Sequence, residues 1–192
     1  MSTEHLQLPE PLAAAHRLGF HHGDGGGQGV DHDPFESFWS AQETAGWIRN
    51  WTGNPHLEGR EFRMFGEEGS GGVVGFWMVR GGVPVEAQPV AFFGSEGERV
   101  VLARDLASFL WLLADDIGPW DAALFADPDL DHDSDLEQEE EPWSRADIAE
   151  VARRYAPDAA RTARQIVLEA QAEFPEFGDL VQGWCDCSPP PQ

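Results

Sequence analysis

Carboxylates in two glycine-rich loops are the groups in this sequence that are best placed for chemistry. The loops span residues 67–72 and 94–98, and their acids are Glu67, Glu68, Glu96 and Glu98. Glu96 and Glu98 are spaced like a general acid and a general base, but both loops carry acids where an enzyme usually carries nucleophiles. A phosphate cradle in the first loop would need a positive field, which its acids oppose. We therefore predict no catalytic residue and interpret the four carboxylates as partner-binding groups.

Three further groups of side chains have the types that bind metal ions. One is a segment near the N-terminus with His21, His22, Asp24, Asp31, His32 and Asp33, which matches no metal motif and is predicted to be a flexible polar loop. Another is an acidic run that mimics an EF-hand, with Asp129, Asp131, Asp133, Asp135 and Glu140, but Ser134 stands where the turn requires glycine. Cys185 and Cys187 alone supply too few ligands for structural zinc. We predict inert thiols, no metal and no cofactor.

The composition favours one folded, strongly acidic domain. The chain has 192 residues, 35 acids against 12 basic residues, all of them arginine, and a net charge of −23. The lack of lysine excludes a Walker A phosphate site and Schiff-base chemistry with pyridoxal phosphate. This charge repels nucleic acids and anionic lipids and attracts basic proteins. Alternatively, the charge serves only solubility or adaptation to salt.

The cysteines and the N-terminal residues indicate a cytoplasmic protein. Two cysteines are present, which is typical of a reducing compartment. The N-terminal residues lack the basic and apolar regions of a signal peptide. No window of the sequence is apolar enough for a membrane-spanning helix.

Eight tryptophans are spread along the chain, and most are predicted to lie in the core. One or two are expected to be exposed anchors for a partner, because tryptophan is enriched in binding hot spots. The sequence does not indicate which of them have this role among Trp39, Trp47, Trp51, Trp77, Trp111, Trp120, Trp143 and Trp184.

Four apolar runs separated by glycine-rich turns predict a sheet built from antiparallel hairpins. The strands are expected at 61–65, 73–79, 90–93 and 99–103. The second run is apolar at odd and even positions, which predicts a central strand covered on both faces. Gly75 within that run indicates a bulge or the close approach of another backbone.

Capping signals predict the helices that accompany this sheet. Ser40 and Glu43 form a capping box for a helix over 41–50. Asp105 caps a largely buried helix over 106–114, which Gly118-Pro119 is expected to end.

The predicted organisation is one α+β domain with appendages. It comprises a flexible N-terminal segment (1–33), the α+β domain (34–126), an acidic linker (127–142), a helical extension (143–178) and a C-terminal tail (179–192). The N-terminal segment is expected to hold at most a short helix over 12–18. Capping boxes that begin at Ser144 and Thr162 predict two helices in the extension.

Three blocks between Pro34 and Trp120 resemble the SUKH superfamily of the Smi–Knr type. They are the turn FGEEGSGG at 65–72, the strand and loop PVAFFGSEGE at 89–98, and VVLA at 100–103 with LASFL at 106–110. The resemblance implies structural roles for the motif residues Phe65, Gly66, Gly69, Gly71, Gly72, Gly94, Ser95 and Gly97. The region before residue 34 departs from the family pattern.

The resemblance implies an α+β fold with a mixed, largely antiparallel central sheet flanked by helices, and a role that is not enzymatic. Bacterial members act as immunity proteins that bind and block a cognate toxin, which here implies a basic toxin domain as the partner. Eukaryotic members act as scaffolds in the regulation of wall synthesis, so a regulatory protein without a toxin is one alternative. A metal-dependent hydrolase with a dispersed site is the other alternative.

Overall fold

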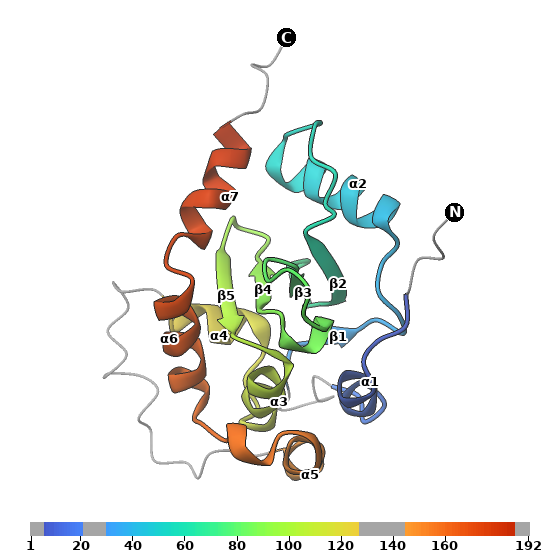
Figure 1. Ribbon diagram of the computed structural model, residues 1–192, viewed down its shortest axis with the longest axis vertical. Coiled ribbons are helices and arrows are strands. Elements are labelled where there is room, and N and C mark those ends of the chain that lie inside the picture. The colour runs from blue at the N-terminus through green and yellow to red at the C-terminus, as the bar shows by residue number, and fades with distance from the viewer. Residues whose placement is uncertain (1–5, 21–29, 127–144, 187–192) are drawn as a thin grey trace.

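Five antiparallel strands form the sheet of the computed structural model, which describes residues 6–20, 30–126 and 145–186. The strands are β1 (Asp33–Pro34), β2 (Phe62–Glu67), β3 (Val73–Trp77), β4 (Val90–Phe93) and β5 (Arg99–Ala103). They lie in chain order, as Figure 1 shows, and each neighbouring pair is antiparallel. The predicted α+β class is confirmed, whereas the sheet within the described residues is antiparallel throughout instead of mixed.

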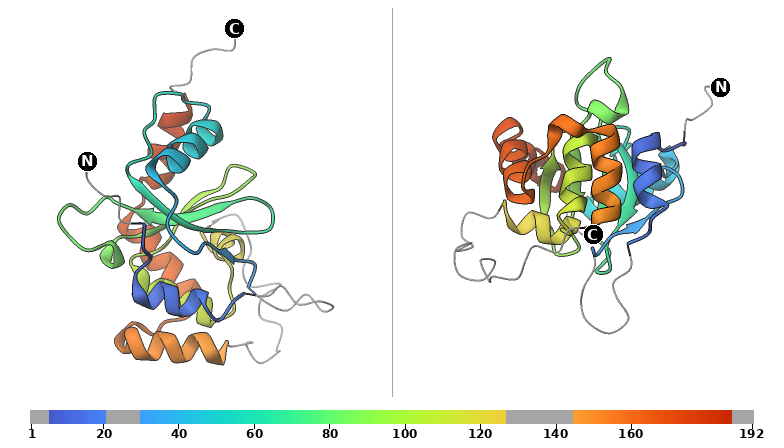
Figure 2. Two further views of the ribbon diagram at one scale, coloured as in Figure 1. Left: turned by 90° about the vertical axis from the view of Figure 1, so that its right-hand side faces the viewer. Right: turned by 90° about the horizontal axis from the view of Figure 1, so that it is seen from below.

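Helices cover both faces of this sheet (Figures 1 and 2). They are α1 (Glu10–His16), α2 (Ala41–Thr52), α3 (Leu106–Ala114), α4 (Pro119–Leu124), α5 (Ala146–Tyr155), α6 (Ala163–Glu173) and α7 (Phe177–Asp186), with 3-10 turns η1 (Val85–Ala87) and η2 (Pro157–Ala159). Helices α2 and α7 lie over one face, and α1, α3 and α5 lie on the other side, where α5 packs on α3. The sheet is therefore the middle layer between two helical layers.

Strand β3 is the central strand, and all five of its residues are buried, as its unbroken apolar pattern predicts. Val74 and Phe76 contribute to the core that includes α3. Val73 and Trp77 contribute to the core beneath α2 and α7. Because neighbouring side chains of a strand point to opposite faces, this strand supplies two separate apolar cores and requires helices on both sides.

The close approach predicted at Gly75 is present. The register of β2 shifts between Met64 and Gly66, so Phe65 is the extra residue of a bulge opposite Gly75. A Cβ atom on Gly75 would lie 2.6 Å from Met64 Sδ and 2.9 Å from the carbonyl oxygen of Arg63. The position therefore requires glycine.

Caps and turns set most element ends where the sequence predicts them. Strands β4 and β5 begin and end at the predicted residues. The capping boxes that start with Ser40 and Thr162 are both formed. Asp105 accepts a backbone hydrogen bond at 2.8 Å at the start of α3, and Gly53, with a φ of 69°, ends α2.

Two strands and one helix differ from the prediction. Strand β2 continues to Glu67, where β1 pairs with it. Strand β3 ends at Trp77 because the chain then turns into a loop, in which the side-chain amide of Gln88 both donates to and accepts from the backbone of Arg80. Gly118-Pro119 begins α4 after a short turn, since proline fits the first turn of a helix without loss of a hydrogen bond.

The N-terminal residues are part of the core, which corrects the flexible segment predicted for 1–33 as far as it is described. Leu12 and Ala15 of α1 are fully buried in the same core as α3 and α5. The helix begins before the predicted start because Pro11 fits in its first turn. Periodicity alone did not reveal this packing, because α1 is short.

The C-terminal helices also belong to the fold, so no boundary at residue 126 separates two cores. Ile148 and Ile166 lie in the core that includes α3, and Val181 lies in the core beneath α2. Helix α7 corrects the tail predicted for 179–192, because it continues to Asp186 and buries Val181 completely.

Residues at the start of this C-terminal part fall partly outside the described chain. Arg145 is the N-cap residue of α5. Trp143 and Ser144, which were predicted to cap that helix, lie outside the described residues, as does the linker predicted for 127–142.

Helix α6 covers the free edge of β5. Gln171 on α6 donates a hydrogen bond from Nε2 to the carbonyl oxygen of Val101 at 2.7 Å. Arg80 and Arg104 also pair with acids of α6. These contacts provide a hydrogen bond for the backbone of β5 and ion pairs along a sheet edge that would otherwise be open.

We expect Gly75→Ala to destabilise the fold by about 1–3 kcal/mol, because the added methyl group overpacks the bulge of β2. Gly46→Ala is the matched control, since a Cβ atom there meets nothing within 4 Å and alanine favours a helix interior by about 0.5–1 kcal/mol. Urea denaturation of both variants measures the free energy of unfolding. Equal stabilities of the two variants would contradict the tight approach at Gly75.

Candidate functional site

The two acidic loops predicted from the sequence lie side by side at one end of the sheet. One joins β2 to β3 and the other joins β4 to β5, and the antiparallel pairing brings both turns to the same end. The hydroxyl groups of Ser70 and Ser95 are hydrogen-bonded at 2.8 Å. We call this surface the rim and define it as residues 31–33, 67–72 and 94–98.

Glu68 is a structural residue of the rim and not one of its surface charges. It is 3% exposed, and its carboxylate accepts hydrogen bonds from the amides of Ser70 and Gly72 at 2.8 and 2.7 Å and from the Ser70 hydroxyl. The Glu68 amide also donates to the carbonyl oxygen of Gly72 at 2.9 Å. Because charged hydrogen bonds of this kind satisfy a buried carboxylate, Glu68 is not available to a partner, which corrects its predicted role.

Glu67, Glu96 and Glu98 are the predicted partner-binding acids that reach the surface. Glu96 is exposed, and Glu67 and Glu98 are half-buried. The Glu98 carboxylate accepts a hydrogen bond from the Glu96 amide at 3.2 Å. The Gly94 amide donates to the carbonyl oxygen of Glu98 at 2.8 Å. The backbone of this loop therefore holds the Glu98 carboxylate in a defined position.

Asp31 joins the rim, although its sequence pattern indicated only a metal-compatible side chain. Its Oδ1 accepts a hydrogen bond from the Gly69 amide at 2.8 Å. Asp33 of β1 lies opposite Glu67 of β2 in the register of the two strands. A cavity of about 430 Å³ lies beside them, with His32 in its wall. Because Asp31 and Gly69 are 38 residues apart, no local pattern in the sequence indicates this contact.

The family-motif residues lie in or beside the rim, and several have clear structural roles. These residues are Phe65, Gly66, Gly69, Gly71, Gly72, Gly94, Ser95 and Gly97. Gly66 lies under an imidazole, since a Cβ atom there would be 2.2 Å from His32 Cε1. Gly71 and Gly97 have φ angles of 95° and 100°, which favour glycine.

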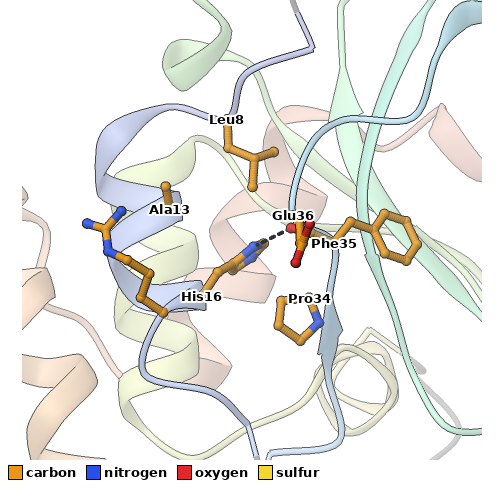
Figure 3. A pocket seen from close by; sticks show the side chains of 7 residues that line it. Leu8, Ala13, His16, Pro34, Phe35 and Glu36 are labelled. Carbon is orange, nitrogen blue, oxygen red and sulfur yellow. Dashed lines mark hydrogen bonds between the residues drawn. The ribbon is translucent and has the colours of Figure 1, made fainter.

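Two histidines, the buried His32 of the rim and the half-buried His16 of α1, pack together, and sequence reasoning missed this pair. His32 is 2% exposed, and its Nε2 lies 3.5 Å from Nε2 of His16. Nδ1 of His16 lies 3.2 Å from the carbonyl oxygen of Phe35 (Figure 3). Since a carbonyl oxygen only accepts, His16 donates from Nδ1 and accepts from His32 at Nε2. The burial of His32 contradicts the flexible polar loop predicted there, whereas residues 21–29 of the same segment lie outside the described residues.

The same pair separates two cavities. His16 faces a cavity of about 340 Å³ between α1 and the residues after β1 (Figure 3), and His32 lies in the wall of the rim cavity. Nδ1 of His32 is buried and has no hydrogen-bond partner of good geometry among the described residues. An imidazole in this setting is stable only when it is neutral.

Burial keeps both imidazoles neutral. Desolvation lowers the pKa of His16 to about 4, although the hydrogen bond with the Phe35 backbone raises this pKa in part. Desolvation and the neighbouring His16 lower the pKa of His32 to about 3, although a backbone contact with Glu67 raises this pKa in part. The ring of Phe65 contacts both imidazoles at centroid distances of 6.1 and 6.4 Å. The pair is therefore an apolar packing element at neutral pH.

The described part of the chain forms no metal site from the candidate metal-binding residues of the sequence. Within residues 6–20, 30–126 and 145–186, no group of three or more His, Cys, Asp and Glu side chains is arranged to hold a metal ion. Cys185 lies on α7 instead of in a loose tail, and burial raises the pKa of its thiol. The acidic run with EF-hand spacing and the residues His21, His22, Asp24 and Cys187 lie outside the described residues.

Comparison of the chain with protein-family models, with curated proteins and with solved structures gives no match in any of the three. The resemblance to the SUKH superfamily therefore depends on the three sequence blocks alone. Among the described helices, none combines the length and the apolar character needed to cross a membrane.

We expect Glu68→Gln to destabilise the fold by about 1–3 kcal/mol, because an amide replaces one acceptor oxygen with a donor that faces buried N–H groups. Glu67→Gln is the matched control, and its half-buried side chain should change the free energy of unfolding by less than about 0.5 kcal/mol. Chemical denaturation at neutral pH measures both. An unchanged stability of Glu68→Gln would show that the loop closes without this carboxylate.

We expect the pair of His16 and His32 to make the protein sensitive to acid. Both folded-state pKa values lie below the unfolded value of about 6.5, so the unfolded chain takes up protons first as the pH falls. The stabilisation is fully present above pH ~6.5 and decreases toward pH 4, by up to about 1.4 kcal/mol per pH unit for each imidazole. His16→Gln, which keeps a donor for the Phe35 carbonyl group, should therefore show a flatter dependence of the free energy of unfolding on pH.

The control for this measurement is His56→Gln, which removes an exposed imidazole. Denaturation curves between pH 7 and pH 4 should separate wild type from His16→Gln progressively. Parallel curves for these two proteins would mean that His16 does not resist protonation in the folded state.

Proposed function

We propose that the chain is a non-enzymatic protein-binding module, an immunity protein that neutralises a basic toxin domain in the bacterial cytoplasm. The observation that carries the proposal is the rim, in which two acidic loops are held together by the hydrogen bond between Ser70 and Ser95. The three sequence blocks that resemble the SUKH superfamily support the same role. They coincide with the turn after β2, with β4 and its loop, and with the step from β5 to α3.

The charges of the rim favour a basic partner. Among the described residues, none of the ion pairs involves Glu67, Glu96 or Glu98. Arg80 and Arg104 instead pair with Glu173 of α6. Surface acids without a counter-ion of their own raise the rate at which a basic partner docks and select against acidic ones.

The chemistry of the rim is better suited to recognition than to turnover. The carboxylate of Glu68 is occupied by the closure of its own loop. The Glu98 carboxylate is partly engaged by the Glu96 amide, so it orders a turn. Fixed charges at defined spacing give a partner register and orientation.

The test is protection from a basic toxin domain that is encoded beside this gene. Co-expression of the chain should restore growth of cells that produce the toxin domain, and the purified proteins should bind. Glu67→Gln combined with Glu96→Gln should lower the association rate constant roughly fivefold at low salt and much less at high salt, since rim charges act mainly on the encounter. Stopped-flow kinetics at two salt concentrations measure this effect.

The matched control removes the same charge from a different layer. Glu150→Gln combined with Asp158→Asn neutralises two exposed acids of α5 and η2 and should change the rate far less. Equal effects of the two double variants would mean that overall charge, and not the rim, drives binding. Binding without protection would favour a regulatory scaffold over an immunity protein, and absence of binding to any such domain would refute the proposal.

A further inference from the structure

Four aromatic rings form a continuous strip that runs from the segment after β1 along one flank of α2. Phe35 stacks on Trp39 with ring centroids 5.0 Å apart, Trp39 contacts Trp47 at 6.3 Å, and Trp47 stacks on Trp51 at 6.1 Å. All four side chains are half-buried. We call these residues the aromatic strip.

The sheet supports the inner side of the aromatic strip. Trp47 and Trp51 lie one helical turn apart, so they project on the same face of α2. Both contact the buried ring of Phe93 edge-on, at centroid distances of 5.8 and 5.3 Å. Each ring therefore has one side fixed on the core and another that is accessible, which is the arrangement of a pre-organised contact surface.

The strip continues into the rim. The indole Nε1 of Trp51 donates a hydrogen bond to the carbonyl oxygen of Gly94 at 2.9 Å, so the last ring is attached to the loop that carries Glu96. Among the described residues, the buried side-chain nitrogen and oxygen atoms without a partner belong to His32 and Asp116. The indole N–H groups of Trp39 and Trp47, for which no hydrogen bond is formed among those residues, therefore reach solvent.

Exposed acids border the strip. Glu43 lies one turn before Trp47 on the same face of α2, and Glu36 follows Phe35 directly. Glu96 lies in the loop to which the Trp51 indole is bonded. Planar aromatic faces beside carboxylates match the guanidinium group, which stacks on rings and donates two parallel hydrogen bonds to one carboxylate.

We propose that the aromatic strip and the rim form one interface, and that it binds an arginine-rich segment of a basic partner protein. This inference rests on the proposed function and adds the chemistry of the partner. The guanidinium groups stack on the indoles of Trp39 and Trp47 while their charges meet Glu43 and Glu96. Lysine fits this surface less well, because its compact ammonium group is strongly hydrated and does not stack.

The experiment compares a nona-arginine with a nona-lysine peptide of equal charge. Isothermal titration calorimetry with the full chain at low salt should give binding of both peptides, with the arginine peptide about tenfold tighter, as expected for partly desolvated cation–π contacts. Trp47→Leu keeps an apolar cover on Phe93 and should remove most of this preference. Trp47→Phe keeps an aromatic face and should retain it.

Trp120→Leu provides the control, because Trp120 on α4 is 42% exposed and lies outside the strip; this variant should keep the full preference for arginine. The combined variant Glu67→Gln and Glu96→Gln should weaken the binding of both peptides.

Equal binding of the two peptides by wild type, or an unchanged preference in Trp47→Leu, would overturn the role of the strip and leave the proposed function standing. A loss of preference in Trp120→Leu as large as in Trp47→Leu would also overturn it, because the effect would not be local. If neither peptide binds at low salt, the rim has no affinity for basic segments, and the proposed function fails together with this inference.

Discussion

The burial of β3 on both faces is the constraint on which the rest of the structure depends. A strand with apolar side chains in both directions is stable only between two helical layers. That requirement draws α1 and α5 onto the layer of α3 and α7 onto the layer of α2. The antiparallel pairing of the strands places the turn between β2 and β3 and the turn between β4 and β5 at one end of the sheet, where the hydroxyls of Ser70 and Ser95 meet.

The sequence predicts the central part of this fold well and its periphery poorly. Strands β4 and β5, helix α3 and the caps at Ser40 and Asp105 depend on turn, cap and periodicity signals that act over a few residues. The packing of α1 and α7 depends instead on contacts between distant segments, and α1 has seven residues with little pattern. Such short amphipathic segments become helices only in their tertiary setting.

The same division applies to the candidate site. The acidic loops were visible in the sequence because glycines and glutamates adjoin there, but their individual roles were not. Glu68 faces inward because its own turn offers it unpaired amides. Asp31 and His32 are placed by the segment that leads into β1, whose two residues carry no strand signal, and His16 is placed by α1. Whether an acid is a surface charge or an internal ligand is decided by donors that only the folded chain brings near.

The cover that α6 places on β5 limits how any other protein can approach this molecule. The opposite edge strand, β1, has only two residues, and the side chain of Gln171 occupies the Val101 carbonyl group on the β5 edge. These edges therefore offer few free backbone groups to which a strand of another protein could hydrogen-bond to extend the sheet. Recognition of another protein by this molecule would therefore depend on surface side chains, and substitutions outside the two cores can change that surface while the architecture stays the same.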